Sequence, residues 1–477
     1  MFRAIRMAVG AIGVLATGAQ AATAPLASQT DLMSVYQQAV ENNADLAASR
    51  ADFAARQESV PQARAGLLPN LSAGADVNDT RQALDKPAMT ANRSGTSYRA
   101  TLSQPIFRAD RWFQLKAAEA ADEQAGLELS ATEQNLILQT AERYFAVLRA
   151  QDGLATARAE ENAFRRQLDQ SNERFNVGLT DKTDTLQSQA SYDTARANRS
   201  TAERQVSDAF QALITLTNRE YNALQGVVHT LPVLPPLPND ARAWVDTATQ
   251  QNLQLLASNF AVDAAQQTLR QRKAGHAPTL DAVAQYEKGD NDNFELSNPS
   301  NNGVVYGGDV ERRTIGLRLE IPLYSGGLTS SQVREAYQRF SQSEYRREGL
   351  RRQVVEDTRN LHRAVNTDVE LVKARKQSII SNQSAVEATE IGYQVGTRNI
   401  VDVLDAQRQL YASVRDYNDS RYDYILDNLR LKQAAGTLSP QDLQDLGQYL
   451  NPNYNPDKDF LPPDLEAQAK ALLKPNR

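Results

Sequence analysis

The sequence predicts a mixed α and β protein, in which two internal repeats each carry a pair of β-strands and a very long helical hairpin. Residues 110–177 contain no proline and only two glycines, so they can form one helix of roughly 100 Å. Four short stretches alternate between apolar and polar residues, which is typical of strands. Residues 175–184 match residues 393–402 at a constant offset, and this match indicates the repeat.

The first 21 residues have the composition of a secretory signal peptide. Arg3 and Arg6 precede an apolar segment at 7–16, and Ala19-Gln20-Ala21 has the small-x-small form of a cleavage site. We therefore expect residues 1–21 to be removed and the mature chain to be exported.

The repeats set the expected domain boundaries. The first repeat covers 22–226, with strands at about 67–107 and a helical hairpin at about 110–225 whose tip lies at 175–184. After a proline-rich connector at 227–239, the second repeat covers 240–436, with strands at about 277–324 and a hairpin at about 328–435 whose tip lies at 393–402. Residues 437–477 form an equatorial segment and a tail, which we expect to be extended or disordered from residue 451.

The four predicted strands form two hairpins. The first has a polar interval at 78–97, and the second has a longer one at 288–309, rich in Asn, Asp and Gly, which we expect to be an outward-facing loop. The alternation fits strands of a membrane barrel and also half-buried strands of a soluble sheet. Four strands are too few to close a membrane barrel, so strands that span a bilayer must be pooled between subunits.

The predicted helices have the pattern of coiled coils. Val403, Leu410, Tyr417, Tyr424 and Leu431 repeat every seven residues, which predicts packing against neighbouring helices. Shorter helical pairs are expected at 31–66 and 240–275, each leading into strands. We interpret these apolar stripes as core packing, with no role in cofactor binding.

Each hairpin tip contains a glycine suited to the left-handed conformation that ends a helix, namely Gly178 and Gly396. Thr397 or Asn399 can cap the helix that follows the second tip. Asp402 and Asp405 then lie one turn apart on one face near the start of that helix. Acidic residues at this position commonly complement the helix dipole.

Several classes of function are disfavoured by the composition. The chain has no cysteine, and its histidines, His229, His276 and His362, are far apart and in no metal-binding motif. It carries no nucleophile elbow and no phosphate-binding loop. The net charge of −6 argues against a nucleic-acid partner. We expect no catalytic residues, metal or cofactor.

The order of signal, helical pair, strands, long helix, tip and return helix resembles the outer membrane efflux protein family over essentially the whole mature chain. Three runs carry the resemblance: Arg-Phe-Asn-Val-Gly-Leu at 174–179, Val-Gly-Thr-Arg at 395–398 with Ile-Val-Asp-Val-Leu-Asp-Ala at 400–406, and Ile-Pro-Leu-Tyr at 321–324 with Gly326-Gly327. Each run alone is a weak signal, but their order and spacing over two copies are specific.

The resemblance implies a homotrimer in the outer membrane. Four strands per subunit would close a twelve-stranded transmembrane β-barrel, continued across the periplasm by an α-helical coiled-coil barrel. The expected function is a passive exit duct of a tripartite efflux or type I secretion system for drugs, toxins or proteins. The implied partners are a periplasmic adaptor protein, an inner membrane transporter of the ABC or RND type, and outer membrane lipid.

The resemblance also implies roles for the tip residues. In a trimer, Asp402 and Asp405 would form two rings of carboxylates at the periplasmic entrance. Links between neighbouring hairpins would involve Thr183, Asp184, Tyr393 and Arg398 and would hold the entrance closed. Gln187 takes the place of Asp405 in the first hairpin, so only the second should line the constriction.

Two other functions remain open at this point. A periplasmic coiled-coil scaffold with a small sheet and no pore would be recovered without detergent. An exported enzyme is disfavoured because the catalytic motifs are missing.

Overall fold

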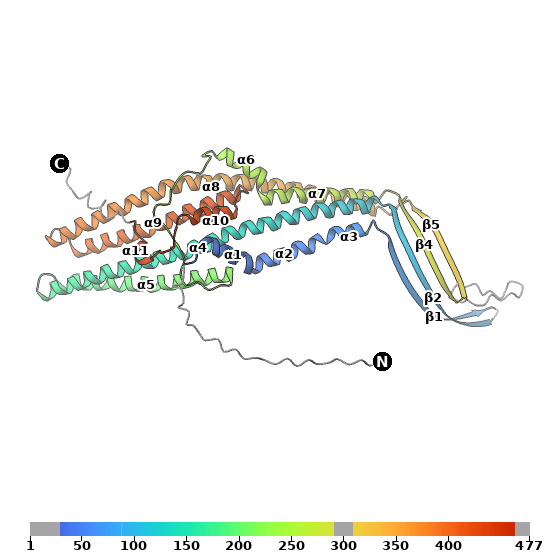
Figure 1. The fold of residues 1–477 in the computed structure, drawn as a ribbon, viewed down its shortest axis with the longest axis horizontal. Coiled ribbons are helices and arrows are strands. Elements are labelled where there is room, and N and C mark those ends of the chain that lie inside the picture. Colours follow the sequence, from blue (N-terminus) through green and yellow to red (C-terminus); the bar gives the residue numbers. More distant parts are fainter. Residues whose placement is uncertain (1–28, 87, 291–308, 463–477) are drawn as a thin grey trace, which may run out of the picture.

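The computed structural model describes residues 29–86, 88–290 and 309–462, which form an elongated molecule with a sheet at one end and two helical tips at the other (Figure 1). Helices α4 (Ala109–Asn176) and α8 (Leu328–Gln394) start next to the sheet and end at the tips. The predicted signal peptide, most of the predicted loop at 288–309 and the tail beyond residue 462 lie outside the described residues.

In the first half of the chain, shorter helices lie alongside α4. Helices α1 (Leu32–Asn42), α2 (Ala44–Gln57) and α3 (Ser59–Ala65) lead toward the sheet, and α5 (Lys182–Thr217) returns from the tip. The interruption between α2 and α3 was not predicted. Pro61 explains it, because proline lacks the N–H and its ring clashes with the carbonyl of residue 57.

The second half places α6 (Ala241–Gln251), α7 (Leu253–Ala274) and α9 (Ile400–Ala434) beside α8. Arg270 stands at the position in α7 that corresponds to Pro61, and α7 is continuous there. Asn252 caps α7 by accepting a hydrogen bond from the Leu255 N–H at 3.0 Å. Its side-chain amide also donates to the Ala434 carbonyl at 3.0 Å, so this residue joins the end of α9 to the start of α7.

The return helix of the first hairpin is shorter than the predicted range, which reached residue 225. Helix α5 ends at Thr217, and Asn218 adopts a left-handed conformation with φ of 50°, which asparagine tolerates better than most residues. The chain then forms β3 (Gly226–Val227), which pairs with β6 (Leu450–Asn451). The predicted connector at 227–239 therefore begins inside a strand.

The sheet has four antiparallel strands in the order β1 (Asn70–Asp85), β2 (Ala88–Phe107), β4 (Thr279–Asp290) and β5 (Asp309–Glu320). The register aligns Leu71, Leu102, Ala284 and Ile315 across all four strands. Because side chains alternate between faces, this row lies on one face of the sheet. The same face carries Leu317 and Leu319.

The polar interval at 78–97, expected as the counterpart of the loop in the second hairpin, is not a loop but part of the first β-hairpin. The ladder continues without a break through Asn78 and Thr80 to Asp85, and the chain turns at Lys86. The polar residues suggested a loop, but strand pairing needs only backbone groups, and described side chains such as Asp79 and Thr80 remain exposed to solvent.

The C-terminal segment also differs from the prediction. We expected residues from 451 onward to be extended or disordered, and for 451–462 this is wrong. After α10 (Pro440–Gly447), the chain forms β6 and α11 (Pro456–Asp459), and the side chains of Tyr454 and Phe460 are buried. The segment is ordered because its polar groups find distant partners, such as Gln29, whose side-chain amide donates to the Tyr454 carbonyl at 2.7 Å.

The main hydrophobic core lies midway along the helices, between the sheet and the tips. Tyr144 and Phe145 of α4 and Tyr422 of α9 are almost fully buried there, and the first two rings meet edge to face at 5.6 Å. None of the helices in the described residues is long and apolar enough to cross a membrane.

Candidate functional site at the helical tips

The two helical hairpins turn in the same way. At the first tip, Gly178 has a φ of 74°, its N–H donates to the Phe175 carbonyl, and the Leu179 N–H donates to the Arg174 carbonyl at 2.8 Å. At the second tip, Gly396 also has a φ of 74°, and its N–H donates to the Tyr393 carbonyl. These are the hydrogen bonds of a Schellman motif, which favours glycine at the left-handed position.

The helix after the first tip is capped by Asp181. Its side chain accepts hydrogen bonds from the N–H groups of Thr183 at 2.8 Å and Asp184 at 3.2 Å. The Asp184 carboxylate accepts a hydrogen bond from the hydroxyl of Thr180. Thr183 is exposed and Asp184 is half-buried. The hydrogen bonds that these two residues make within one chain are to Asp181 and Thr180, in their own turn.

The helix after the second tip begins with a capping box. The Asn399 side chain accepts from the Asp402 N–H at 2.9 Å, and the Asp402 carboxylate accepts from the Asn399 N–H at 3.3 Å. Arg398 lies 3.9 Å from the same carboxylate. Asp405, one turn further, is exposed and accepts from the Arg408 guanidinium at 2.6 Å. Asp402 thus makes the helix-start contact that its sequence position favours.

Tyr393 connects the two hairpins. It belongs to a small buried cluster that also contains Phe164 and Ala195 of the first hairpin and Ile400 and Val403 of the second. The guanidinium carbon of Arg174, at the end of α4, lies 4.7 Å from the centre of this ring. Sequence reasoning singled out Tyr393 but missed Arg174, although Arg174 is part of the run that carries the family resemblance.

Large apolar side chains are exposed around both tips. Phe175, Val177 and Leu179 at the first tip and Ile391 and Val395 at the second are each at least two-fifths exposed. Solvent-exposed apolar patches of this kind commonly mark interaction surfaces.

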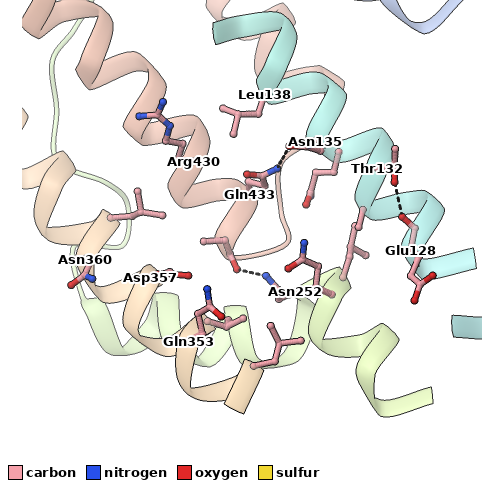
Figure 2. Close-up of a pocket in the computed structure, with 18 residues that line it drawn as sticks. Glu128, Thr132, Asn135, Leu138, Asn252, Gln353, Asp357, Asn360, Arg430 and Gln433 are labelled. Carbon is pink, nitrogen blue, oxygen red and sulfur yellow. Dashed lines mark hydrogen bonds between the residues drawn. The ribbon is translucent and has the colours of Figure 1, made fainter. Parts of the chain in front are cut away.

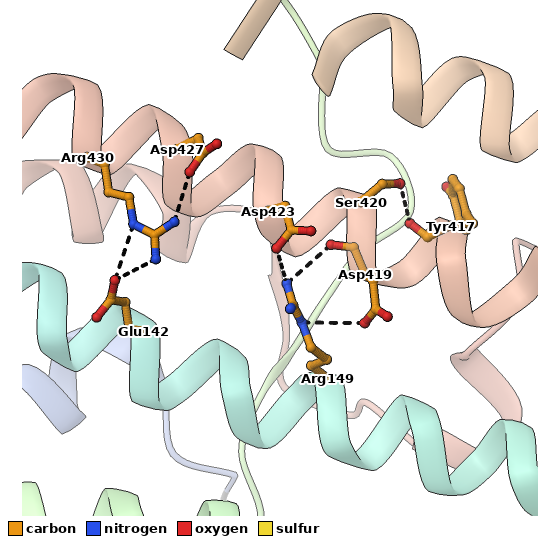
Figure 3. Close-up of polar contacts among 8 residues, drawn as sticks. All are labelled: Glu142, Arg149, Tyr417, Asp419, Ser420, Asp423, Asp427 and Arg430. Atoms are coloured by element: carbon orange, nitrogen blue, oxygen red, sulfur yellow. Dashed lines mark hydrogen bonds and ion pairs between the residues drawn. The ribbon is translucent and has the colours of Figure 1, made fainter. Parts of the chain in front are cut away.

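Between the tips and the sheet, a series of ion pairs joins α4 to α9 (Figure 3). Arg149 of α4 lies 3.4 Å from Asp419 and also binds Asp423. Arg430 of α9 binds Glu142 of α4 at 2.7 Å and Asp427 at 2.9 Å. Arg149 thus connects α4 to two carboxylates of α9, and Arg430 connects α9 to one carboxylate of α4.

A cavity of about 780 Å³ lies where α9 ends and α7 begins, between α4 and α8 (Figure 2). Its polar lining consists mainly of carboxamide side chains, among them Asn135, Asn252, Gln353 and Gln433. Within the described ranges, no group of three or more His, Asp or Glu side chains is arranged to hold a metal ion.

The family model for outer membrane efflux proteins matches residues 35–219 and 244–437, which is most of the chain. The chain belongs to the outer membrane efflux protein family. The resemblance drawn from the tip sequences is thereby confirmed.

Three relatives can be aligned with this chain over most of their own length. Outer membrane protein TolC of Vibrio cholerae is 37% identical over 87% of this chain and 93% of its own. TolC of Escherichia coli K12 is 36% identical over 89% and 86%. Alkaline protease secretion protein AprF of Pseudomonas aeruginosa is 27% identical over 87% and 86%.

Solved structures of outer membrane channels share the fold. A crystal structure of CusC, described in connection with transmembrane channel formation, covers 88% of this chain and 99% of its own, with a TM-score of 0.75 and 17% sequence identity. The mixed, helix-rich architecture is thus that of the channel proteins of this family.

Proposed function

We propose that this protein is an outer membrane exit duct of a tripartite efflux or type I secretion system. The observation that carries the proposal is the direct continuation of a sheet with one exposed apolar face into helices of 68 and 67 residues. Ile315 is 90% exposed on this face and Leu317 is 69% exposed. Such a face suits lipid, while helices of roughly 100 Å suit a passage across the periplasm.

The functional unit is a homotrimer with a twelve-stranded transmembrane barrel, continued by a helical coiled-coil barrel. Two features support this assembly. Strands β1 and β5 are the edges of the sheet and have unpaired backbone groups that strands of neighbouring subunits would satisfy. Tyr337 and Tyr345 on α8 are more than half exposed in the single chain, as expected for residues that pack against another subunit.

The chain consists of two repeats, 22–226 and 240–436, joined by the connector at 227–239. The family model matches two segments, 35–219 inside the first range and 244–437, which begins inside the second range and ends one residue beyond it. The corresponding hairpins end in the same glycine turn, with Gly178 and Gly396 at equal φ. The equatorial segment after residue 436 contacts the junction between the repeats, through the pairing of β6 with β3.

The tips form the periplasmic entrance. Asp402 and Asp405 of three chains make two carboxylate rings that favour cations, and Thr183, Asp184, Tyr393 and Arg398 take part in the contacts that keep the entrance closed. The Asp402 side chain is still 38% exposed while it takes part in the capping box, so the cap and the ring are compatible roles. The exposed apolar residues of the tips support docking of a periplasmic adaptor, which connects the duct to an inner membrane transporter of the ABC or RND type.

The duct has no catalytic role, and its cargo is set by the transporter. The matched relatives include a protein whose name refers to alkaline protease secretion, while the family description refers to efflux. Comparison of a deletion strain with its parent, for drug sensitivity and for missing secreted proteins, separates the two kinds of cargo.

Single-channel recording of the detergent-purified mature protein tests the proposal. We expect a small conductance in a planar bilayer that prefers cations in a salt gradient. A protein that is recovered without detergent and never conducts would instead be a periplasmic coiled-coil scaffold, which is the second candidate. The continuous α4 and α8 helices are compatible with that role, but the exposed Ile315 and Leu317 are not.

A further inference from the structure

Arg174 makes a side-chain contact between the two hairpins of one chain at the tips. It lies in the last turn of α4, and Tyr393 lies in the last turn of α8. The guanidinium carbon is 4.7 Å from the ring centre, well within the range of a cation–π interaction. Each residue directly precedes a tip turn, so the contact joins the two turns themselves.

The contact uses the ring of Tyr393 and not its hydroxyl group. The Tyr393 side chain is 8% exposed, and its hydroxyl has no hydrogen-bond partner among the described residues. Asp184, which the family resemblance includes with Tyr393 among the residues of the gating links, accepts a hydrogen bond from Thr180 of its own turn. In this arrangement Tyr393 is therefore positioned by apolar packing and by Arg174.

We propose that Arg174 is a positioning residue of the entrance, which holds the second hairpin against the first by stacking its guanidinium on the Tyr393 ring. This inference rests on the proposed function, because the hairpin that carries Asp402 and Asp405 must move for the entrance to widen. Separating the two tips would expose the Tyr393 ring and break the stack. Loss of the stack should therefore favour the open arrangement.

Substitutions can separate a ring contact from a hydroxyl contact. Tyr393→Phe keeps an aromatic face, whereas Tyr393→Leu keeps an apolar side chain but removes that face. Arg174→Ala removes the cation, and Arg174→Lys keeps the charge but loses the planar group that stacks. Arg165→Ala is the matched control, because Arg165 is an exposed arginine on the same helix.

The first measurement is hydrogen exchange of the amides of residues 386–394 in the detergent-purified full chain. A partly buried cation–π contact corresponds to a roughly two- to thirtyfold change in an opening equilibrium. We expect Arg174→Ala and Tyr393→Leu to speed exchange by such a factor, with no further increase when they are combined. Tyr393→Phe and Arg165→Ala should exchange like the parent. Exchange in the sheet, which should not change, checks that each variant is folded.

The second measurement is single-channel conductance of the same proteins, where Arg174→Ala should increase opening. A conducting parent with unchanged exchange and conductance in Arg174→Ala would overturn the proposal. Faster exchange in Tyr393→Phe would also overturn it, because that result would assign the contact to the hydroxyl. A parent that never conducts would refute the proposed duct, and the exchange data would still decide whether Arg174 holds the hairpins together.

Discussion

The carboxylate of Asp152, on α4, accepts a hydrogen bond from the hydroxyl of Tyr422, on α9, at 2.7 Å inside the main core. The hydroxyl of Tyr454, from the C-terminal segment, donates to the other carboxylate oxygen. Asp152 is 2% exposed. One buried acid thus joins both long hairpins to the C-terminal segment at 450–462.

The first prediction concerns this acid. Burial raises the pKa of Asp152 to about 6, although the two tyrosine hydrogen bonds act in the opposite direction. Between the unfolded pKa of about 4 and the folded pKa, the folded state holds a proton that the unfolded state has lost. The contribution of Asp152 to stability is therefore greatest at low pH and falls as pH rises through 6.

The test is denaturant unfolding of the parent and of Asp152→Asn between pH 4 and 8. The difference in free energy of unfolding, parent minus variant, should fall by up to about 3 kcal/mol between pH 4 and 7 and then level off. A difference that does not change with pH would contradict the assignment. The neutral asparagine is its own control, since it cannot titrate.

The second prediction concerns the close approach of Gly226 to Tyr454. A methyl group on Gly226 would overlap the ring atoms of Tyr454, so Gly226→Ala should displace the ring and lower the free energy of unfolding by about 1–3 kcal/mol. Gly153→Ala is a matched control, because a methyl group there meets no atom within 4 Å. In a helix interior it should stabilise the protein by up to about 1 kcal/mol. Equal stability of the two variants would show that the C-terminal segment does not pack as described.

The third prediction separates the charge of Asp402 from its capping role. Asp402→Asn combined with Asp405→Asn removes both carboxylates but keeps an oxygen that can accept from the Asn399 N–H. We expect the cation preference in a salt gradient to fall roughly tenfold, with an unchanged unfolding temperature. Asp193→Asn, an exposed position on α5, is the control. An unchanged reversal potential in the double variant would refute the carboxylate rings.

The fourth prediction concerns Arg398, whose side chain packs over Gly392 and lies near Asp402. Arg398→Ser should increase the open fraction of the channel by up to about fivefold, because it removes the proposed link to Asp184 of another hairpin, and an exposed ion pair contributes at most about 1 kcal/mol. Single-channel recording measures this fraction. Equal conductance of variant and parent would mean that Arg398 does not help to close the entrance.

The sequence by itself was sufficient for features that depend on local physics. Gly178 and Gly396 could be recognised as helix-ending residues because few other residues adopt a positive φ. The long helices followed from the absence of proline between residues 110 and 177, and the strands from their alternation. The family followed from the order and spacing of short runs.

Only the tertiary structure decided the contacts between segments distant in sequence. No residue near Tyr454 in the sequence indicates that its hydroxyl binds Asp152, which lies 302 residues earlier. For this reason the segment at 451–462 was expected to be extended or disordered, although Tyr454 and Phe460 are buried. The stack of Arg174 on Tyr393 was equally invisible, because it depends on how two hairpins approach each other. Local propensity depends on neighbouring residues, whereas such contacts depend on the packing of the whole chain, which no short pattern encodes.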